Sequence, residues 1–546
     1  MPAITGKIHT FISNVNPSAV NPSGMRKFMW EDQMLHLLME DQKNYDAEFC
    51  GNLAIHQTNS IQDYGYLLVA DHQTLNIVQG SENIEELTGR SIRDLINTNI
   101  AELFPELDIQ ALQNEISRGP RNRVPMRCAF HNHAGGQILN ILLHVKTGQL
   151  IFEIEIDDEI PERSFSAVFQ EVRSFISVLE STENLNEICQ ASIQEIRRIA
   201  GFDGIRMYQF DHQWNGTVVA EEITGELESY LGQTFPASDV PKQARALYIK
   251  NPYRLIPNRN YKASRLFPVI NPIIHGFLDL SDCNLRSIAA VHLEYMANMN
   301  VAASMSIRVM VEGQLWGLIS CHHVTEKYLG LEIRSIFEWL SMEISYRISA
   351  VIKQEELGRS AEMLKIQGAV VETIFNNESI EKGLTTDQNK YVLSLFNSTG
   401  FALKINGSIS TVGSTPQQEE LENLFLWASR KAADTVYTTQ WLGNVYDEAG
   451  PYTEVASGIL AIPFGTQNSD MLIFFRPELI REIKWGGNPN EAISFDNDGV
   501  NYHPRNSFKL WQQTVRGQSA KWTAAEMEAA ESFRSFLLGF RNEKTV

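Results

Sequence analysis

The chain has 546 residues, which is too long for one hydrophobic core and predicts three or four domains. Hydrophobic residues make up 43% and charged residues 21% of the sequence, a composition typical of folded globular proteins and not of disordered or fibrous ones. Lys and Arg number 46 against 66 Asp and Glu, so the formal net charge is -20 and neither nucleic acid nor a membrane surface is expected as a partner.

The cysteines indicate a reducing compartment. There are five of them and no two form a CxxC pair, which argues against a disulfide framework and against a zinc knuckle. The N-terminus has no basic segment followed by an uninterrupted apolar one, and no stretch approaches the roughly 20 apolar residues of a membrane helix. We therefore expect a cytoplasmic protein without a membrane segment.

The first part of the chain predicts an arm followed by a small domain. Residues 1–45 are rich in Asn, Ser and Met and are interpreted as an N-terminal arm. Residues 46–158 carry two strand-like runs, short segments with helical spacing and three more strand-like runs, an order typical of a small α+β sensor domain. The strands are expected at 66–71, 75–81, 123–130, 137–148 and 149–158.

Residues 159–340 predict a second α+β domain. Two amphipathic helices, the second ending at Gly201, precede four strand-like runs. An excursion rich in Pro and Asn, from about 252 to 284, interrupts this sheet, and loops of that length in a compact domain usually carry function. The strands are expected at 204–210, 217–223, 303–313 and 314–323.

A long helix is expected between about 331 and 372. Its apolar residues recur every three or four positions in a near-heptad rhythm. A stripe of this kind suits either a helix packed on its own domain or an interdomain spine that also joins two copies of the chain, and periodicity leaves both open. The stripe consists of Ile333, Phe337, Leu340, Ile344, Ile348 and Val351.

Residues 341–546 predict the spine and a third domain. A turn-rich insertion from about 482 to 522 interrupts the alternation of helices and strands, and an amphipathic helix ends the chain. The predicted fold is therefore α+β, with three mixed antiparallel-sheet domains joined by a long helical spine and an insertion in the third. Strands of the third domain are expected at 391–396, 400–405, 456–464 and 470–478.

No motif for enzymatic chemistry is present. The sequence lacks the GxxxxGK[ST] phosphate loop, the HExxH zinc helix and the GxSxG nucleophile elbow, so we expect no catalytic domain in this chain. Adjacent His322 and His323 lie on a predicted strand, where neighbouring side chains point to opposite faces, which disfavours a shared metal ion.

Polar residues of the second domain predict a ligand pocket. Arg286, His292 and Tyr295 are expected on one helical segment, and Ser304 and Ser306 are expected on one face of the strand that follows. Together with Asp239 they suit a flat, acidic ligand with polar edges. Two plainer interpretations stay open, since Asp239 could simply cap a helix and His292 could be a core residue.

Strings in all three domains resemble the photosensory module of bacterial phytochromes. FPASDVP (235–241), LRSIAAVHLEYMANM (285–299) and QLWGLISCHH (314–323) closely resemble the chromophore-binding domain of that family. WGGNP (485–489) and HPRNSF (503–508), with the later Trp522, resemble the tongue of the phytochrome-specific domain. The segment from Phe49 to Asp71 resembles the one that carries the cysteine to which the family attaches its bilin.

The resemblance implies a red/far-red photoreceptor of PAS (46–158), GAF (159–340) and PHY (within 341–546) domains. Family members hold a linear tetrapyrrole that isomerises between 15Z and 15E in light. Of the two attachment positions known in the family, the N-terminal one is Cys50 here and the other is Val291, which has no nucleophile. Covalent biliverdin IXα, bound through a thioether to Cys50, is therefore the expected cofactor.

The resemblance also assigns roles within the pocket. Asp239, through its backbone carbonyl, and His292 would face the pyrrole nitrogens, and Arg254 and Arg286 would pair with the two propionates. Aromatic side chains would surround ring D, and His322 would bind its carbonyl. The residues expected around the chromophore are Tyr208, Phe235, Asp239, Val240, Pro241, Arg254, Arg286, Ser287, His292, Tyr295, Ser304, Ser306 and His322.

The tongue would carry the signal out of the pocket. In the family an arginine matching Arg505 pairs with the aspartate matching Asp239 in the red-absorbing state. After isomerisation the tongue refolds from hairpin to helix, and Ser507 takes over the contact with the aspartate. The tongue residues expected to matter are Trp485, Pro504, Arg505, Ser507 and Trp522.

The sequence also departs from the family pattern. Asp63-Tyr64, Ala289-Ala290 and Asn300 replace the residues that are usual there. A homodimer through the spine is expected, with a histidine kinase output or a response regulator as partner outside this chain. Rival interpretations are a sensor of another small molecule and a dimerisation scaffold, although neither needs a thiol aligned with a pair of arginines.

Overall fold

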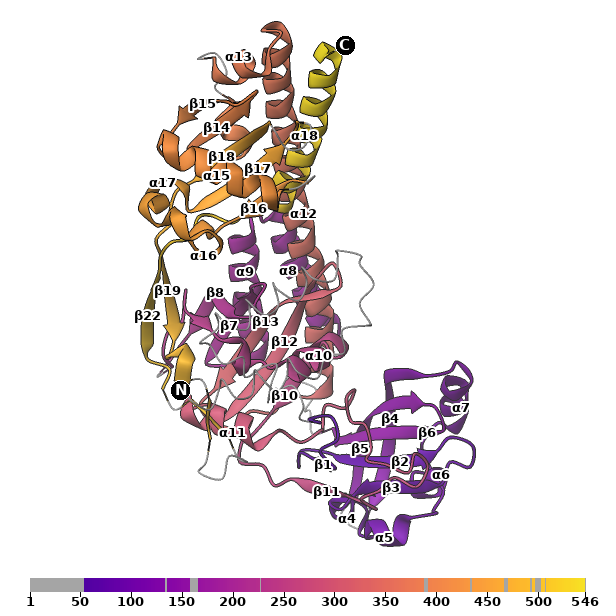
Figure 1. The fold of residues 1–546 in the computed structure, drawn as a ribbon. Coiled ribbons are helices and arrows are strands. Elements are labelled where there is room, and N and C mark those ends of the chain that lie inside the picture. The colour runs from indigo at the N-terminus through magenta and orange to yellow at the C-terminus, as the bar shows by residue number, and fades with distance from the viewer. Residues whose placement is uncertain are drawn as a thin grey trace, which may run out of the picture.

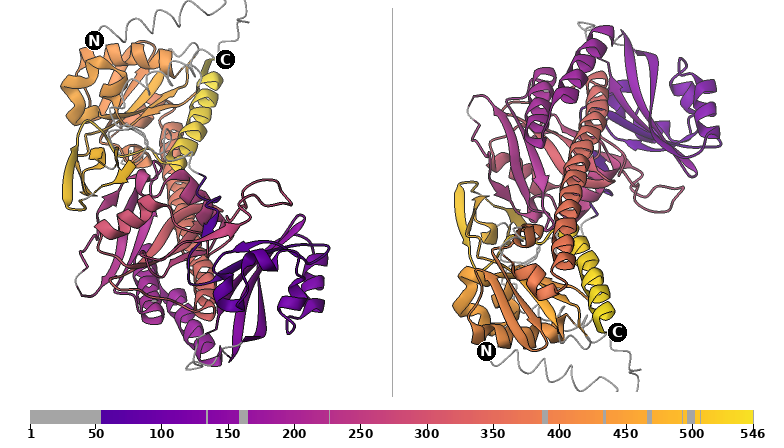
Figure 2. Two further views of the ribbon diagram at one scale, coloured as in Figure 1. Left: turned by 90° about the horizontal axis from the view of Figure 1, so that it is seen from below. Right: turned by 90° about the horizontal axis from the view of Figure 1, so that it is seen from above.

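Three sheet-containing domains follow one another along the chain, and a long helix joins the second to the third (Figures 1 and 2). The computed structural model describes residues 54–132, 135–157, 165–225, 227–386, 391–432, 435–465, 470–491, 493–495, 502–505 and 507–545. The expected N-terminal arm and Cys50 lie outside these residues. Antiparallel sheets combined with helices confirm the predicted α+β class.

The first domain is an antiparallel sheet covered by short helices. Buried side chains of the sheet, such as Leu68, Ile141 and Phe152, pack against Leu95 and Phe104 from the helical part. Its strands are β1 (Ser60–Ile61), β2 (Tyr66–Asp71), β3 (Ile77–Ser81), β4 (Arg121–Asn132), β5 (Gly135–Lys146) and β6 (Gln149–Ile156). Its helices are α4 (Ile84–Thr88), α5 (Ile92–Leu95), α6 (Ile100–Leu103) and α7 (Ile109–Ser117).

One strand of this sheet comes from the second domain. β11 (Ser264–Phe267), part of the long excursion, lies between β1 and β3. On the other side of β1, the main-chain N–H of Gln62 donates to Leu285 O at 2.7 Å, and that of Ser287 donates to Ser60 O at 3.1 Å. The excursion and its continuation therefore hold residues 60–62 along both edges, which ties the first domain to the second.

The second domain is built on strands that form the larger part of an eight-stranded sheet. Helix α9 packs on β7 and β8, and the long helix α12 packs on β12. The strands are β7 (Gly204–Phe210), β8 (Gly216–Ile223), β9 (Thr234–Phe235), β10 (Tyr253–Ile256), β12 (Ala303–Val311) and β13 (Gln314–His323). The helices are α8 (Phe165–Ser181), α9 (Leu185–Ala200), the 3-10 turn η2 (Ala237–Asp239), α10 (Lys242–Lys250) and α11 (Ala290–Asn298).

Helix α9 shows how local sequence sets these elements. The Asn184 side chain accepts from the N–H of Glu187 and caps the helix start. Gly201 ends the helix with a φ of 62°, a left-handed conformation that costs glycine little. Between these ends, Ile188, Ile193 and Ile196 fall on one face and are fully buried.

The spine is one continuous helix, α12 (Leu331–Asn376). Its predicted apolar stripe, from Phe337 to Val351, is buried in the core of the second domain, and Ile333 packs against that core. Further along, Val370 and Ile374 belong to the core of the third domain. The stripe is therefore used within the chain, so a second copy would have to use another face of the helix.

The third domain has a five-stranded antiparallel sheet. Its strands are β14 (Gly400–Ile405), β15 (Ser408–Gly413), β16 (Tyr437–Thr439), β17 (Gly458–Pro463) and β18 (Met471–Arg476). Its helices are α13 (Ile380–Thr385), α14 (Tyr391–Leu395), α15 (Gln418–Lys431), α16 (Leu442–Val445), the 3-10 turn η3 (Asp447–Tyr452), α17 (Thr453–Ala456) and α18 (Ala524–Thr545).

The prediction of a strand at 391–396 is wrong, because this segment forms helix α14 (Tyr391–Leu395). Its buried residues Leu395 and Phe396 follow the buried Val392 by three and four positions, which places all three on one helical face. The preference of Tyr, Val and Phe for strands suggested the opposite assignment, and the packing of these side chains into the third-domain core decided the conformation.

The insertion of the third domain is a hairpin arm that reaches the second domain (Figure 1). β19 (Arg481–Gly486) pairs with β22 (Leu510–Val515), and Trp485 of β19 pairs in parallel with Thr234 of β9. The arm thus extends the second-domain sheet to eight strands. Near its far end are the 3-10 turn η5 (Pro489–Glu491) and two short strands, β20 (Ile493–Phe495) and β21 (Tyr502–Pro504).

Trp522, predicted as a tongue residue, lies beyond the hairpin in the third-domain core. Its indole Nε1 donates to Thr439 O at 3.1 Å, and the Arg476 guanidinium lies 3.6 Å from the ring centroid. It therefore anchors the base of the arm.

Among the described residues, no helix combines the length and the apolar character needed to cross a membrane.

Arg334 of α12 forms an ion pair with Glu155 of β6, and neither side chain is more than 4% exposed. Arg334→Met leaves this carboxylate buried without its cation, so we expect the free energy of unfolding to fall by roughly 3–5 kcal/mol. Urea denaturation followed by tryptophan fluorescence measures the change. Arg118→Met is the control, because Arg118 is exposed in its pair with Glu115 and should cost about 1 kcal/mol or less. Equal stability of the two variants would contradict the expectation.

Candidate functional site

A cavity of about 240 Å³ lies in the second domain. The strands of the sheet form one wall, and α10, α11 and the segment before α11 form the other. Its lining contains every pocket residue expected from the sequence: Tyr208, Phe235, Asp239, Val240, Pro241, Arg254, Arg286, Ser287, His292, Tyr295, Ser304, Ser306 and His322.

Two arginines, the partly buried Arg254 and the buried Arg286, lie at one end of this cavity. Arg254 on β10 donates to Cys283 O at 3.3 Å, and Arg286 donates to Leu280 O and Ser281 O at 3.4 Å. Neither forms an ion pair with a carboxylate in the described part of the chain. Burial, and then the charge of Arg254, lowers the pKa of Arg286 to about 9. Two close cations that are at least partly buried and lack carboxylate partners favour an anionic ligand.

Arg286 does not lie on the helix where the sequence pattern placed it. α11 begins at Ala290, and residue 286 forms an isolated β-bridge with Ile61 instead. The bridge to the first domain overrides the helical spacing of this segment. As a consequence, the guanidinium approaches the cavity from an irregular segment that main-chain hydrogen bonds hold in place.

Hydroxyl groups surround the two arginines. Ser306 on β12 lies directly opposite Arg254 on β10, and Ser304 lies two residues away on the same face. The buried Ser287 Oγ has no hydrogen-bond partner among the described residues. Tyr248 of α10 also lines the cavity, and burial raises the pKa of its phenol. Tyr248 was not predicted, although its position four residues after Ala244, which also lines the cavity, places both on one face of α10.

Two neutral imidazoles line the cavity. Desolvation by the surrounding protein, and then the charge of Arg254, lowers the pKa of His292, although the residue is exposed in the cavity lining. Its ring stacks on Tyr295, with 6.1 Å between ring centroids and 7° between ring planes. Burial, and then the charge of Arg206, lowers the pKa of His322 to about 3. Both histidines are therefore uncharged at neutral pH.

Aromatic rings form the other end of the cavity. Tyr208 and Tyr230 both meet Phe235 edge-on, with ring centroids 5.6 and 5.4 Å apart. Phe508 of the hairpin arm packs on Tyr295 at 5.1 Å. Tyr230 and Phe508 pack against the rings that line the cavity and do not belong to the lining themselves. They were not predicted, because only the folded sheet and the docked arm bring them there.

Asp239 connects the cavity to the hairpin arm. Its Oδ2 accepts a hydrogen bond from the Tyr295 hydroxyl at 2.7 Å, and the same oxygen forms an ion pair with Arg505. Burial raises the pKa of Asp239, while Arg505 opposes that shift. The side chain makes no cap contact with α10, whose N-cap residue is Pro241, so the interpretation of Asp239 as a helix cap is wrong.

The other predicted tongue residues occupy different surroundings. Pro504 reaches the cavity lining, and Trp485 is buried in β19 with its Nε1 donating to Gln513 Oε1 at 2.9 Å. Ser507 is exposed and lies beside Gly487. Gly487 has a φ of 100°, where an added Cβ would lie 2.4 Å from Ser507 O. The arm therefore needs glycine at this position.

The departures from the expected pattern are also accommodated. Asn300 has a φ of 56°, a left-handed conformation that Asn tolerates better than most residues other than Gly. Ala289 and Ala290 begin α11 without a side-chain cap. Asp63 accepts from the N–H of Lys262 at 2.8 Å. Tyr64 packs on Tyr328, with ring centroids 5.7 Å apart.

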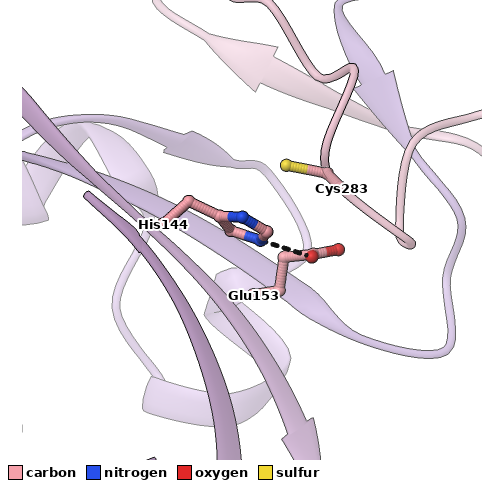
Figure 3. Close-up of side chains that lie close together, drawn as sticks. All are labelled: His144, Glu153 and Cys283. Atoms are coloured by element: carbon pink, nitrogen blue, oxygen red, sulfur yellow. Dashed lines mark hydrogen bonds and ion pairs between the residues drawn. The ribbon is translucent and has the colours of Figure 1, made fainter. Parts of the chain in front are cut away.

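A second cluster, of His144, Glu153 and Cys283, lies where the first domain meets the excursion (Figure 3). His144 Nε2 lies 2.8 Å from Glu153 Oε1, and Glu153 Oε2 accepts from the N–H of Leu285 at 2.7 Å. The N–H of Arg123 donates to His144 Nδ1 at 3.4 Å. Nδ1 is thus an acceptor and the proton lies on Nε2, where a metal ion would need a lone pair, so the cluster fits a hydrogen-bond network.

Comparison with known proteins covers most of the chain. The family models that match are a PAS fold over residues 50–157, a GAF domain over 184–345 and a phytochrome region over 363–545. Cyanobacterial phytochrome B from Nostoc is 34% identical, covering 91% of this chain and 67% of the relative. A bacteriophytochrome from Xanthomonas campestris is 30% identical, covering 90% and 78%.

Solved structures agree with these matches. The bacteriophytochrome structure from R. palustris superimposes with a TM-score of 0.79 at 33% identity, covering 90% of this chain and 98% of that one. The photosensory core module of the Stigmatella aurantiaca phytochrome gives 0.77 at 32% identity, with the same coverage. The chain spans about two thirds of the length of the cyanobacterial relatives, 67% and 65% for the first two. The chain belongs to the phytochrome family.

Proposed function

We propose that this chain is a red/far-red photoreceptor module that binds biliverdin IXα in the second-domain cavity through a thioether to Cys50. The pair of Arg254 and Arg286, partly buried and buried, carries this proposal, because neither has a carboxylate partner among the described residues and aromatic rings lie at the other end of the cavity. When bound, a linear tetrapyrrole supplies a double bond that isomerises on absorbing red light. The protein's own residues bind it, orient it and respond to the change.

Arg254 and Arg286 suit the two propionates of such a ligand. A guanidinium can donate two parallel hydrogen bonds to one carboxylate, and in a buried site this pairing offsets the cost of burying both charges. Ser306, next to Arg254, and Ser287, whose Oγ has no partner among the described residues, add hydroxyl donors. These contacts would fix which end of the ligand lies at the arginines.

The middle of the cavity suits the protonated pyrrole nitrogens. They need acceptors and disfavour further cations nearby. The main-chain carbonyl of Asp239 can accept, and neutral His292 can accept without adding charge. The low pKa of His292 thus supports a role close to a cationic ligand.

The aromatic end supports the isomerising ring. Burial raises the pKa of the Tyr208 and Tyr295 phenols, so both stay neutral and can donate hydrogen bonds. His322 lies in the same lining. Rotation of the ring would press on Tyr295, whose hydroxyl donates to the carboxylate that holds Arg505. Motion in the cavity can therefore reach the hairpin arm through one oxygen atom of Asp239.

The described arm is a hairpin with the Arg505–Asp239 ion pair formed. This is the arrangement that the family resemblance assigns to the red-absorbing state. Ser507 would take over the aspartate after isomerisation, while the arm refolds to a helix. Such a switch requires the two arrangements to differ by only a few kcal/mol. The signal would then pass along α12 and α18 to a histidine kinase or response regulator in the cytoplasm.

Covalent attachment is tested by expressing the full chain together with a biliverdin source. We expect a zinc-dependent fluorescent band on a denaturing gel, and a red absorption band that red light converts reversibly. Cys50→Ala should lose the gel band, because only a thiol at this position can form the thioether. Cys283→Ser is the matched control, since Cys283 lines the cavity and should not be needed. A colourless wild type, or a band that persists in Cys50→Ala, would refute the attachment.

The ion pair of the arm is tested by hydrogen exchange. Arg505→Met leaves Asp239 buried without its cation, so the contact between arm and cavity should weaken by roughly 2–4 kcal/mol. Amide exchange at 502–505 and in β19 should then become on the order of 30-fold or more faster. Arg481→Met, at an exposed position of β19, is the control. Unchanged exchange in Arg505→Met would show that the arm does not depend on this pair.

A homodimer is proposed through the face of α12 opposite to its core stripe. Met342, Tyr346, Leu357 and Leu364 lie along this face and are all more than half exposed. Their spacings of 4, 11 and 7 residues keep them on one side of the helix, as in a coiled-coil seam. Two such stripes would cover each other in a parallel pair of spines.

The dimer is tested with the double variant Leu357→Glu/Leu364→Glu. Charges placed in a buried seam repel, so we expect a monomer in sedimentation analysis at concentrations where the wild type is a dimer. Leu426→Glu is the control, because Leu426 is an equally exposed leucine on α15. A double variant that remains dimeric would exclude this face.

A further inference from the structure

Arg206 is a buried arginine just outside the cavity lining. It lies on β7, and its side chain is only 1% exposed. Nε pairs with Glu221 Oε1 at 2.6 Å, and Nη2 donates to Glu228 O at 2.6 Å. Nη1 lies 3.1 Å from His322 Nδ1. The guanidinium thus has three fixed partners, and one of them is a histidine of the cavity wall.

The contact with Arg206 determines which nitrogen of His322 carries the proton. A guanidinium has donors only, so His322 Nδ1 must accept its hydrogen bond. A neutral imidazole then carries its proton on Nε2. Nε2 lies 2.8 Å from Ser320 Oγ, and Ser320 also lines the cavity. His322 is therefore held with a single N–H, and that N–H is on the nitrogen that faces Ser320.

The groups around the His322 ring also favour its neutral form. The titratable groups that act on His322 are Arg206 from β7 and His292 from α11, and its neighbour across on β12 is the uncharged Ser304. A proton on Nδ1 would break the hydrogen bond from Arg206 and place two cations side by side in a buried site. The lost hydrogen bond and the repulsion between the two cations both disfavour the imidazolium, in agreement with the low pKa of His322.

We propose that Arg206 is a positioning residue that locks His322 in its Nε2–H tautomer, so that His322 donates to a ligand carbonyl at the aromatic end of the cavity. Ser320 Oγ accepts this proton when no carbonyl is within reach. The nature of the ligand rests on the proposed function, whereas the tautomer rests on Arg206 alone. The absorption band of the bound pigment then becomes insensitive to pH at this site.

The test needs a variant that removes the guanidinium without leaving a buried carboxylate. Arg206→Met alone would strand Glu221, which is 4% exposed, so the double variant Arg206→Met/Glu221→Gln is used. Glu221→Gln alone is the matched control, because it keeps the hydrogen bond from Arg206 to His322. Neither residue lines the cavity.

The first readout uses the apoprotein of the full chain with ¹⁵N-labelled histidine. The His322 ring signals are assigned by their loss in His322→Asn. We expect the wild type and Glu221→Gln to show a constant Nε2–H tautomer from pH 5 to 8. The double variant should show mixed tautomers over the same range, because His322 Nδ1 no longer accepts from a guanidinium. A wild-type ring that titrates here, or a double variant that matches the wild type, would overturn the proposal.

The second readout is the absorption spectrum of the pigmented protein over the same pH range. We expect the same constant red band in the wild type and in Glu221→Gln, and a band displaced from the wild-type position in the double variant. A double variant that binds pigment and keeps the wild-type band would refute the role at the ligand. Failure of the wild type to bind pigment would instead refute the proposed function, while the tautomer result in the apoprotein would stand.

Discussion

The contact between Asp239 and Arg505 is the constraint on which the relation between the cavity and the third domain depends. Both side chains are buried, and burial alone would raise the pKa of the carboxyl, while Arg505 acts to keep it ionised. A buried pair of this kind adds little stability compared with apolar packing, yet it is costly to break on one side only. It therefore selects between arrangements of the arm more than it stabilises the fold. Tyr295 donates to the same oxygen, so the cavity and the arm share one acceptor.

Charge is distributed unevenly along the cavity, and this distribution favours one orientation of a bound ligand. Two guanidiniums without carboxylate partners lie at one end, neutral imidazoles lie along the wall, and uncharged aromatic rings close the other end. An anionic group is drawn to the arginines, while a conjugated, apolar group fits among the rings. A ligand that carries both can bind in only one orientation. That orientation would place its moving end against Tyr295, which packs on Phe508 of the arm.

The sequence predicts the parts of this site that short motifs encode, and it misses those that need distant strands. The pocket residues of FPASDVP and of the segment around His292 all reach the cavity lining. No local pattern shows that β11 enters the first-domain sheet or that β19 pairs with β9, because both pairings join segments far apart in the chain. Arg286 was placed on a helix because its spacing fits one, and a bridge to Ile61 prevents that helix from starting earlier. Arg206 gave no signal, since an arginine in a strand is expected to face solvent.

The long helix shows how one element can serve two domains and still leave a face for a partner. Its first half buries Phe337, Leu340 and Ile344 in the second domain, and its last turns bury Val370 and Ile374 in the third. Helix α12 contains no proline that would kink it at one point, so a change in how the arm holds the third domain acts along the whole spine. The arm and the spine form two connections between the same two domains (Figure 1). If the hairpin becomes a helix, the rise per residue of the arm falls from about 3.3 to about 1.5 Å, so the arm becomes shorter. The spine, which joins the same two domains, must then bend or rotate.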